Sequence, residues 1–157
     1  MKNVLFLCTG NSCRSIMLEA LLKHYGQGKY ASFSAGSFPT GTVHPLSLAT
    51  LERNGISPIG YESKSWDKFI GFKFDIVITV CDNAAGETCP IFLGSPAKAH
   101  WGTPDPASFG GTAEEIEAEF ERVFRILELR VKEFVELPID DLNRQELTIK
   151  LNMIGKL

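Results

Sequence analysis

A cysteine and an arginine near the start of the chain have the spacing of an anion-binding loop. Five residues separate Cys8 from Arg14, in the segment CTGNSCRS. A loop of this length can curl its main-chain N–H groups around a tetrahedral oxyanion, while the planar guanidinium of Arg14 binds two of its oxygens. The same N–H groups and the arginine charge would lower the pKa of Cys8, which predicts a thiolate nucleophile inside its own anion-binding loop.

The residues between the cysteine and the arginine suit such a loop. Gly10 permits a left-handed backbone conformation and Asn11 tolerates one, and the hydroxyl of Ser15 could donate to the thiolate. The alternative interpretation is a buried apolar Cys8 beside an ordinary Arg14 on a helix surface. We predict that the oxyanion binds to the loop residues Thr9, Gly10, Asn11, Ser12, Cys13, Arg14 and Ser15.

Strands and helices that alternate along the chain position this loop. Strands are expected at the short apolar run Val4–Leu7 and at Phe74–Val80, which is dense in β-branched residues, and the segments Phe33–Gly36 and Ala97–Trp101 are further candidates. Helices are expected from near Ser12 to Gly26, from Pro45 to Asn54, and from Thr112 to Pro138. The alternation predicts an α/β fold with a parallel sheet, whose ligands bind at the carboxyl ends of the strands.

Composition and charge exclude several classes of function. The chain has the 157 residues of a single domain and a net charge of −3, so it lacks the basic surface of a nucleic-acid-binding protein. No apolar run approaches the ~20 residues of a membrane span, and no secretory leader is expected at its start. We therefore expect a cytoplasmic protein with neither nucleic acid nor membrane as a partner.

The expected cytoplasmic location affects which roles the four cysteines can have. There they are more often catalytic, metal-binding or redox-active than part of a disulfide framework. Cys8, Cys13, Cys81 and Cys89 form no C-x-x-C pair, and no histidine stands beside them at a zinc-finger spacing. We predict no metal site and no cofactor, and we expect thiol chemistry instead.

The segment VLFLCTGNSCRS resembles the opening of the low-molecular-weight tyrosine phosphatase superfamily, and more closely that of its thioredoxin-coupled arsenate reductase branch. The resemblance runs from about Asn3 to Phe134. It implies a four-stranded parallel sheet flanked by helices within a domain of residues 1–137. Residues 138–157 would then be a C-terminal extension, which is either a short docked helix or a loosely held tail.

The same resemblance implies roles for individual residues. Cys8 would be the nucleophile, Arg14 the oxyanion clamp, and Asp105 of the Asp105-Pro106 dipeptide the acid that protonates a leaving oxygen. Pro-Asp-Pro is also strong turn chemistry, and both interpretations can hold together. Ala107 stands where the phosphatases usually carry tyrosine, which favours the reductase branch.

Two further cysteines also favour a reductase. Cys81 ends the clearest predicted strand, at the same sheet edge as Cys8, and Cys89 follows eight positions later. We predict that Cys8 forms an adduct with arsenic, that Cys81 attacks the Cys8 sulfur to release arsenite, and that Cys89 then attacks Cys81. The resulting disulfide would pass to thioredoxin, or to glutaredoxin and glutathione. Phosphate or sulfate would compete with arsenate. The alternative is two unrelated buried thiols.

A helix across residues 81–89 would have to unwind in this relay. Eight residues of helix separate two Cα atoms by ~12 Å, whereas a disulfide needs them about 4.4–6.8 Å apart. We therefore predict a redox switch in this segment, with Gly86 as the residue at which it yields.

Other functions remain open at this point. A phosphotyrosine phosphatase with redox-regulatory cysteines would use Cys13 as an auxiliary thiol, and an anion-binding or redox-sensing module would use no catalysis at all. Some related reductases hold potassium beside the loop, and Asn11, Glu19 and Ser34 match residues used for it. Lys64 stands where an acidic ligand is expected. Its ammonium either replaces the ion by pairing with Glu19 or is simply solvated.

Overall fold

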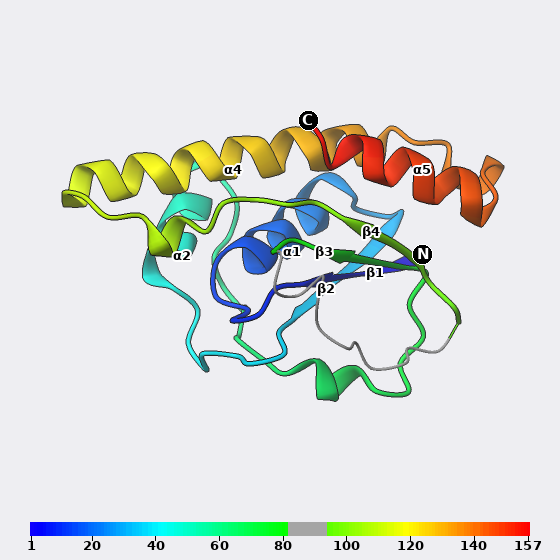
Figure 1. The fold of residues 1–157 in the computed structure, drawn as a ribbon, viewed down its shortest axis with the longest axis horizontal. Helices are drawn as coiled ribbons and strands as arrows, with labels where there is room; N and C mark the ends of the chain where they lie inside the picture. Colours follow the sequence, from blue (N-terminus) through cyan, green and yellow to red (C-terminus); the bar gives the residue numbers. More distant parts are fainter. Residues whose placement is uncertain (82–93) are drawn as a thin grey trace.

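A parallel sheet of four strands forms the centre of the protein. We analysed it in a computed structural model, which describes residues 1–81 and 94–157. Cys89 and the predicted redox switch lie outside the described residues. The strands are β1 (Lys2–Leu7), β2 (Tyr30–Ala35), β3 (Ile76–Thr79) and β4 (Ala97–His100). They lie in the order β2-β1-β3-β4 (Figure 1), which confirms the predicted fold class.

The register of the sheet brings the candidate residues to one edge. Leu7, at the end of β1, pairs with Ala35 on one side and with Thr79 on the other, and Thr79 pairs with His100. Parallel strands that end in register deliver the residues that follow them to the same edge. The loop after β1, Cys81 and the segment after β4 therefore meet there.

The second strand begins earlier than the sequence predicts. Tyr30 pairs with Lys2 at the start of β1, so hydrogen bonds between the two strands extend β2 over six residues. Its sequence YASFSA has only weak strand character, which is why the expected strand began at Phe33. Pairing with a buried neighbour overrides the local preference here.

The helices α1 (Arg14–Tyr25), α2 (Pro45–Arg53) and α4 (Ala113–Val135) occur where the sequence predicts them. Thr112 and Glu115 form the predicted capping box, with each side chain bonded to the other's main-chain N–H. Figure 1 shows α4 and the C-terminal helix running along one side of the sheet, with α1 beside the strands. Among the described residues, no helix has the length and apolar character needed to cross a membrane.

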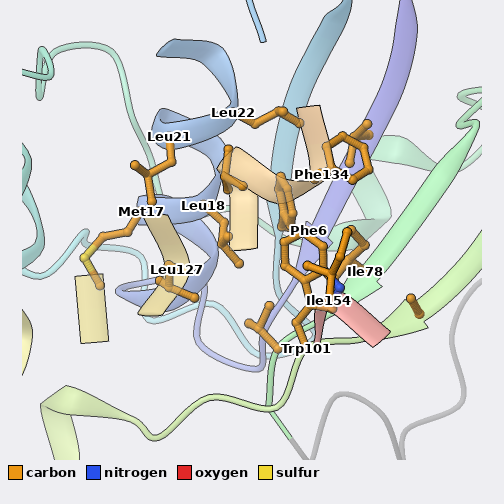
Figure 2. Close-up of a cluster of buried hydrophobic side chains, with 14 of the residues drawn as sticks. Phe6, Met17, Leu18, Leu21, Leu22, Ile78, Trp101, Leu127, Phe134 and Ile154 are labelled. Carbon is orange, nitrogen blue, oxygen red and sulfur yellow. The ribbon is translucent and has the colours of Figure 1, made fainter. Parts of the chain in front are cut away.

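The main hydrophobic core fills the space between this helical layer and the sheet. Figure 2 shows Phe6, Trp101, Phe134 and Ile154 gathered in this core. The ring of Trp101 lies 6.1 Å from that of Phe6 and 6.1 Å from that of Phe134. A second cluster covers the opposite face of the sheet and comprises Leu5, Leu7, Ala35, Phe69, Phe74 and Val77.

The C-terminal residues form a docked helix, α5 (Arg144–Ile154), which begins at a second capping box made by Asn143 and Glu146. Leu147, Leu151 and Ile154 are buried against the main core. The indole Nε1 of Trp101 donates to the carbonyl oxygen of Leu151 at 2.9 Å. Of the two expectations for this segment, the docked helix is therefore confirmed.

Candidate active site

The loop that follows β1 turns directly into a helix. Cys8 donates its main-chain N–H to Ala35 at 3.2 Å and so extends the pairing of the sheet by one residue. Cys13 is the N-cap of α1, and Arg14 is its first residue. Asn11 has a φ of +46°, which confirms the predicted tolerance of a left-handed conformation. Gly10 does not adopt a left-handed conformation, and an added Cβ there would lie 3.3 Å from Thr40 Cγ2, a tight contact that a small shift of that side chain would relieve.

Asn11 fixes the shape of the loop from inside the protein. Its buried side chain donates through Nδ2 to Ser15 Oγ at 2.8 Å and to Ser34 Oγ at 3.0 Å. Its Oδ1 accepts the main-chain N–H of Lys64 at 2.9 Å. A left-handed non-glycine residue persists where its surroundings hold it, and these three bonds do so.

A second segment supports the loop from behind. Thr9 O and Gly10 O accept the main-chain N–H groups of Phe38 and Thr40, both at 3.0 Å. A Cβ at Gly36 would lie 2.4 Å from Thr9 O and 2.7 Å from Cys8 O. Sequence reasoning missed Gly36; its one local signal is a glycine directly after a strand, where two backbones approach closely.

Arg14 and Asp105 come together although they are far apart in the sequence. Arg14 donates from one guanidinium nitrogen to Thr103 O at 2.9 Å, and its other terminal nitrogen lies 3.7 Å from Asp105 Oδ2. Its buried Nε has no hydrogen-bond partner within the described part of the chain, so this group is available to an anion. Arg14 and residues 102–105 line a cavity of about 480 Å³.

Asp105 begins a short turn, as its neighbours in the sequence predict. It is the N-cap of the 3₁₀ helix η2 (Pro106–Ser108), where Oδ1 accepts the N–H of Ala107 and Oδ2 accepts the hydroxyl of Ser108, each at 3.0 Å. The turn therefore orients the carboxyl group toward the guanidinium of Arg14. The two interpretations of Pro-Asp-Pro are compatible in one structure.

The thiol of Cys81 lies against the loop. The main-chain N–H of Thr9 donates to Cys81 Sγ at 3.4 Å, and the Thr9 hydroxyl lies 3.4 Å from the same sulfur. Cys8, Cys13 and Cys81 are all buried and reduced in the structure. The structure thus brings together four of the five predicted catalytic residues, Cys8, Arg14, Cys81 and Asp105.

The electrostatics of Cys8 differ from the prediction. A hydrogen bond with Cys81 and burial hold the pKa of the Cys8 thiol above its ordinary value, although Arg14 and the Gly10 N–H act in the opposite direction. The predicted lowering of the Cys8 pKa is therefore wrong for this arrangement. The loop alone would favour a thiolate, but the hydrogen bond to the Cys81 sulfur stabilises the protonated thiol and burial penalises the charged form.

Cys13 is a separate case. Burial raises the pKa of its thiol, and its sulfur lies 4.0 Å from Ser12 Oγ, at the start of α1. It forms no disulfide with Cys8 in the structure. The auxiliary role of Cys13 stays a prediction.

Lys64 and Glu19 form a nearly buried ion pair beside the loop. Lys64 Nζ lies 3.7 Å from Glu19 Oε1, and the two side chains are only 11% and 15% exposed. Ser34 donates to the same carboxyl group, which connects the pair to Asn11. Of the two expectations for Lys64, the pairing with Glu19 is confirmed. These residues do not fit a bound potassium ion, because an ammonium already neutralises the carboxylate.

No metal site emerges from residues 1–81 and 94–157. In that part of the chain, no three histidine, cysteine, aspartate or glutamate side chains stand close enough together to hold an ion.

A parallel α/β sheet that gathers a cysteine, an arginine and an acid at the loop after its first strand is an arrangement suited to binding a tetrahedral oxyanion. Residues 3–147 match the family model for the low molecular weight phosphotyrosine protein phosphatase. The chain belongs to this family, as the resemblance of its first residues predicts.

Similar proteins lie in the arsenate reductase branch. The chain is 38% identical to an arsenate reductase of Bacillus subtilis over 135 residues, which are 86% of this chain and 96% of that protein. A solved structure described as an arsenate reductase in the phosphate-binding state is 31% identical and superposes with a TM-score of 0.68, over 86% of this chain and 97% of that one. A thioredoxin-dependent arsenate reductase of Corynebacterium glutamicum is 28% identical, with a TM-score of 0.57 over 84% of this chain and 62% of that one.

Proposed function

We propose that this protein reduces arsenate to arsenite through a thiol relay that begins at Cys8. The contact of the Cys81 thiol with Cys8 and with Thr9 carries the proposal, because oxyanion hydrolysis needs one thiol and reduction needs a second within reach. The similarity to arsenate reductases of known sequence and structure supports the same activity.

In the first step, the Cys8 sulfur attacks arsenic(V) held in the loop. An S–As bond forms and an As–O bond breaks, and the thiol proton leaves with an arsenate hydroxyl as water. Arg14 binds the remaining oxygens through its planar guanidinium. Asp105, whose carboxylate lies 3.7 Å from that guanidinium, would transfer the proton to the departing oxygen.

In the second step, the Cys81 thiolate attacks the Cys8 sulfur. The S–S bond forms, the S–As bond breaks, and its electron pair stays on arsenic, which leaves as arsenite. The N–H of Thr9 stabilises negative charge on the Cys81 sulfur before the attack. Phosphorus(V) is not reduced by thiols, so the selection of arsenate over phosphate lies in this step and not in the anion loop.

The third step regenerates the nucleophile. Cys89 attacks the Cys81 sulfur, which releases Cys8 and leaves a Cys81–Cys89 disulfide for an external dithiol. We propose thioredoxin as that dithiol, because a related structure is a thioredoxin-dependent arsenate reductase. Glutaredoxin with glutathione is the alternative donor. The relay needs a reducing compartment, and we propose that this compartment is the cytoplasm. We also propose that residues 1–137 form the catalytic domain and that residues 138–157 are an extension of it.

The test is arsenite release by the purified protein, with the thioredoxin system and the glutaredoxin–glutathione system supplied separately. We expect turnover with thioredoxin, competition by phosphate or sulfate, and complete loss in Cys8→Ser. Cys81→Ser should retain hydrolysis of an aryl phosphate but release no arsenite over repeated turnovers. Normal arsenate reduction by Cys81→Ser would refute the relay. Hydrolysis without reduction by the unmodified protein would identify a phosphatase instead.

A further inference from the structure

Arg130 is a buried arginine that the reaction scheme does not use. It lies on the inner face of α4 and is only 5% exposed. Burial lowers its pKa, because the charged form loses hydration. An arginine cannot shed its charge inside a protein, so its burial costs free energy that only close hydrogen bonds can offset.

Its guanidinium binds two separate segments at once. One terminal nitrogen donates to Gly102 O at 3.1 Å and to Thr103 Oγ1 at 2.9 Å. The other donates to the main-chain oxygen of Leu157 at 3.1 Å. In the described part of the chain, Arg130 pairs with no carboxylate side chain. Its hydrogen bonds therefore join two segments that are distant from Arg130 in the sequence.

Thr103 is the residue through which this contact reaches the active site. Its N–H donates to Val80 O at 3.1 Å, and its hydroxyl donates to Trp101 O at 2.8 Å. Its carbonyl oxygen accepts from Arg14 at 2.9 Å. Thr103 thus lies between two arginines, two residues before Asp105. A shift of Thr103 would displace the oxyanion clamp and the acid together.

The other end of the contact belongs to a part of the chain outside the shared family region. The family model matches residues 3–147, so most of α5 and the residues up to Leu157 lie beyond the match. Figure 1 shows the C-terminus beside α4, the helix that contains Arg130, and the bond from Arg130 to Leu157 O joins the two. Gly155 fits closely there, since a Cβ would lie 2.5 Å from His100 O. The C-terminal segment is therefore held against the strand that leads into the Thr103–Asp105 loop.

We propose that Arg130 is a positioning residue, through which the C-terminal segment sets the placement of Arg14 and Asp105. The inference rests on the roles proposed for these two residues. Arg130 touches neither the anion nor the reacting sulfur. It fixes Gly102 and Thr103 on one side and Leu157 on the other, so that the loop bearing the acid has one conformation.

The test uses two variants of Arg130. Arg130→Met keeps an apolar side chain and removes the guanidinium. Arg130→Lys keeps the charge, but one ammonium cannot bond to both Gly102–Thr103 and Leu157. Deletion of residues 156–157 removes the Leu157 contact and leaves Arg130 in place, at the loss of the main-chain bonds from Lys156 and Leu157 to Met153 O and Ile154 O. Arg122→Met on the same helix is the matched control, because Arg122 is 55% exposed and, within the described residues, its ion-pair partner is Glu119 of the same helix.

The readouts separate positioning from folding. Calorimetry with inorganic phosphate should show affinity about ten-fold weaker in Arg130→Met, since displacement of a binding group by about 1 Å can cost up to ~100-fold. Hydrolysis of phenyl phosphate, whose phenolate is a poor leaving group, should fall at least about ten-fold in Arg130→Met. Hydrolysis of 4-nitrophenyl phosphate should fall much less, because its better leaving group depends less on protonation by Asp105. Arg130→Lys and the deletion should give intermediate losses.

Unchanged phosphate affinity and an unchanged ratio of the two ester rates in folded Arg130→Met would overturn the proposal. If that variant does not fold, the same two measurements on the deletion variant decide. Neither measurement requires arsenate reduction, so a failure of the reductase assignment can be told apart from a failure of the role proposed for Arg130. If the unmodified protein hydrolyses no ester, the phosphate affinity alone decides the role of Arg130.

Discussion

Gly36→Ala should damage the anion loop although it replaces no predicted catalytic residue. The added methyl would lie 2.4 Å from Thr9 O and 2.7 Å from Cys8 O, both main-chain atoms. Ordinary contact needs about 3.4 Å, so one backbone has to move by roughly 1 Å. Gly36 cannot retreat, because it donates to Lys64 O and accepts from Trp66 N, both at 2.9 Å. The loop must therefore move.

The displacement has consequences for stability and for binding. Overpacking of this kind costs about 1–3 kcal/mol of unfolding free energy, and a loop misplaced by about 1 Å loses up to ~100-fold in activity. The assay is urea unfolding together with calorimetric binding of inorganic phosphate. Gly110→Ala is the control, since a Cβ there meets no atom within 4 Å. Phosphate affinity within two-fold of the unmodified protein, with no loss of stability, would refute the reasoning.

Three further changes have equally definite outcomes. Lys64→Met should destabilise the protein by about 3–5 kcal/mol at neutral pH, because it removes the ammonium that pairs with the nearly buried Glu19 carboxylate. Burial already raises the pKa of the Glu19 carboxyl, so the free energy of unfolding falls as the pH rises through that pKa. Urea unfolding at pH 5 and pH 8 should show a larger fall in Lys64→Met than in the unmodified protein. Cys81→Ala should lower the pKa of Cys8, because their hydrogen bond is the largest cause of its elevation, and the pH dependence of Cys8 alkylation measures this. Arg14→Lys should weaken phosphate binding by about ten-fold or more in calorimetry, because an ammonium cannot replace the planar fork.

Each of these changes has its own comparison. Lys68→Met removes a pair with Glu62 in which both side chains are more than half exposed, so it should cost no more than about 1 kcal/mol. Equal losses for the two lysines would contradict the buried pair. An unchanged alkylation profile in Cys81→Ala would show that burial alone raises the Cys8 pKa. Phosphate binding undiminished by Arg14→Lys would place the anion elsewhere.

The features that the sequence predicts well depend on neighbours in the chain. The Cys8–Arg14 spacing, the left-handed Asn11 and the capping box of Thr112 need only a few adjacent residues. Alternating strands and helices then predict the parallel sheet, because such connections permit few topologies.

The features that sequence reasoning missed depend on contacts between distant segments. Gly36 matters because the loop after another strand lies against it, and Arg130 binds residues 27 positions away. The pKa of Cys8 was predicted from its own loop, whereas the dominant influence comes from Cys81. A single sequence contains these residues but does not show which of them meet.

The docking of α5 also determines what the sheet can pair with. β4 is an edge strand, and an edge strand exposes N–H groups that can bind a strand of another molecule. Here the N–H of His100 donates instead to Asn152 Oδ1 at 3.2 Å, and Asn152 is itself fixed by a 3.0 Å bond to Thr148 O. The last helix thus acts as a cover that ends the sheet. A chain cut before Arg144 would present β4 as an open edge, and we expect it to self-associate through that strand.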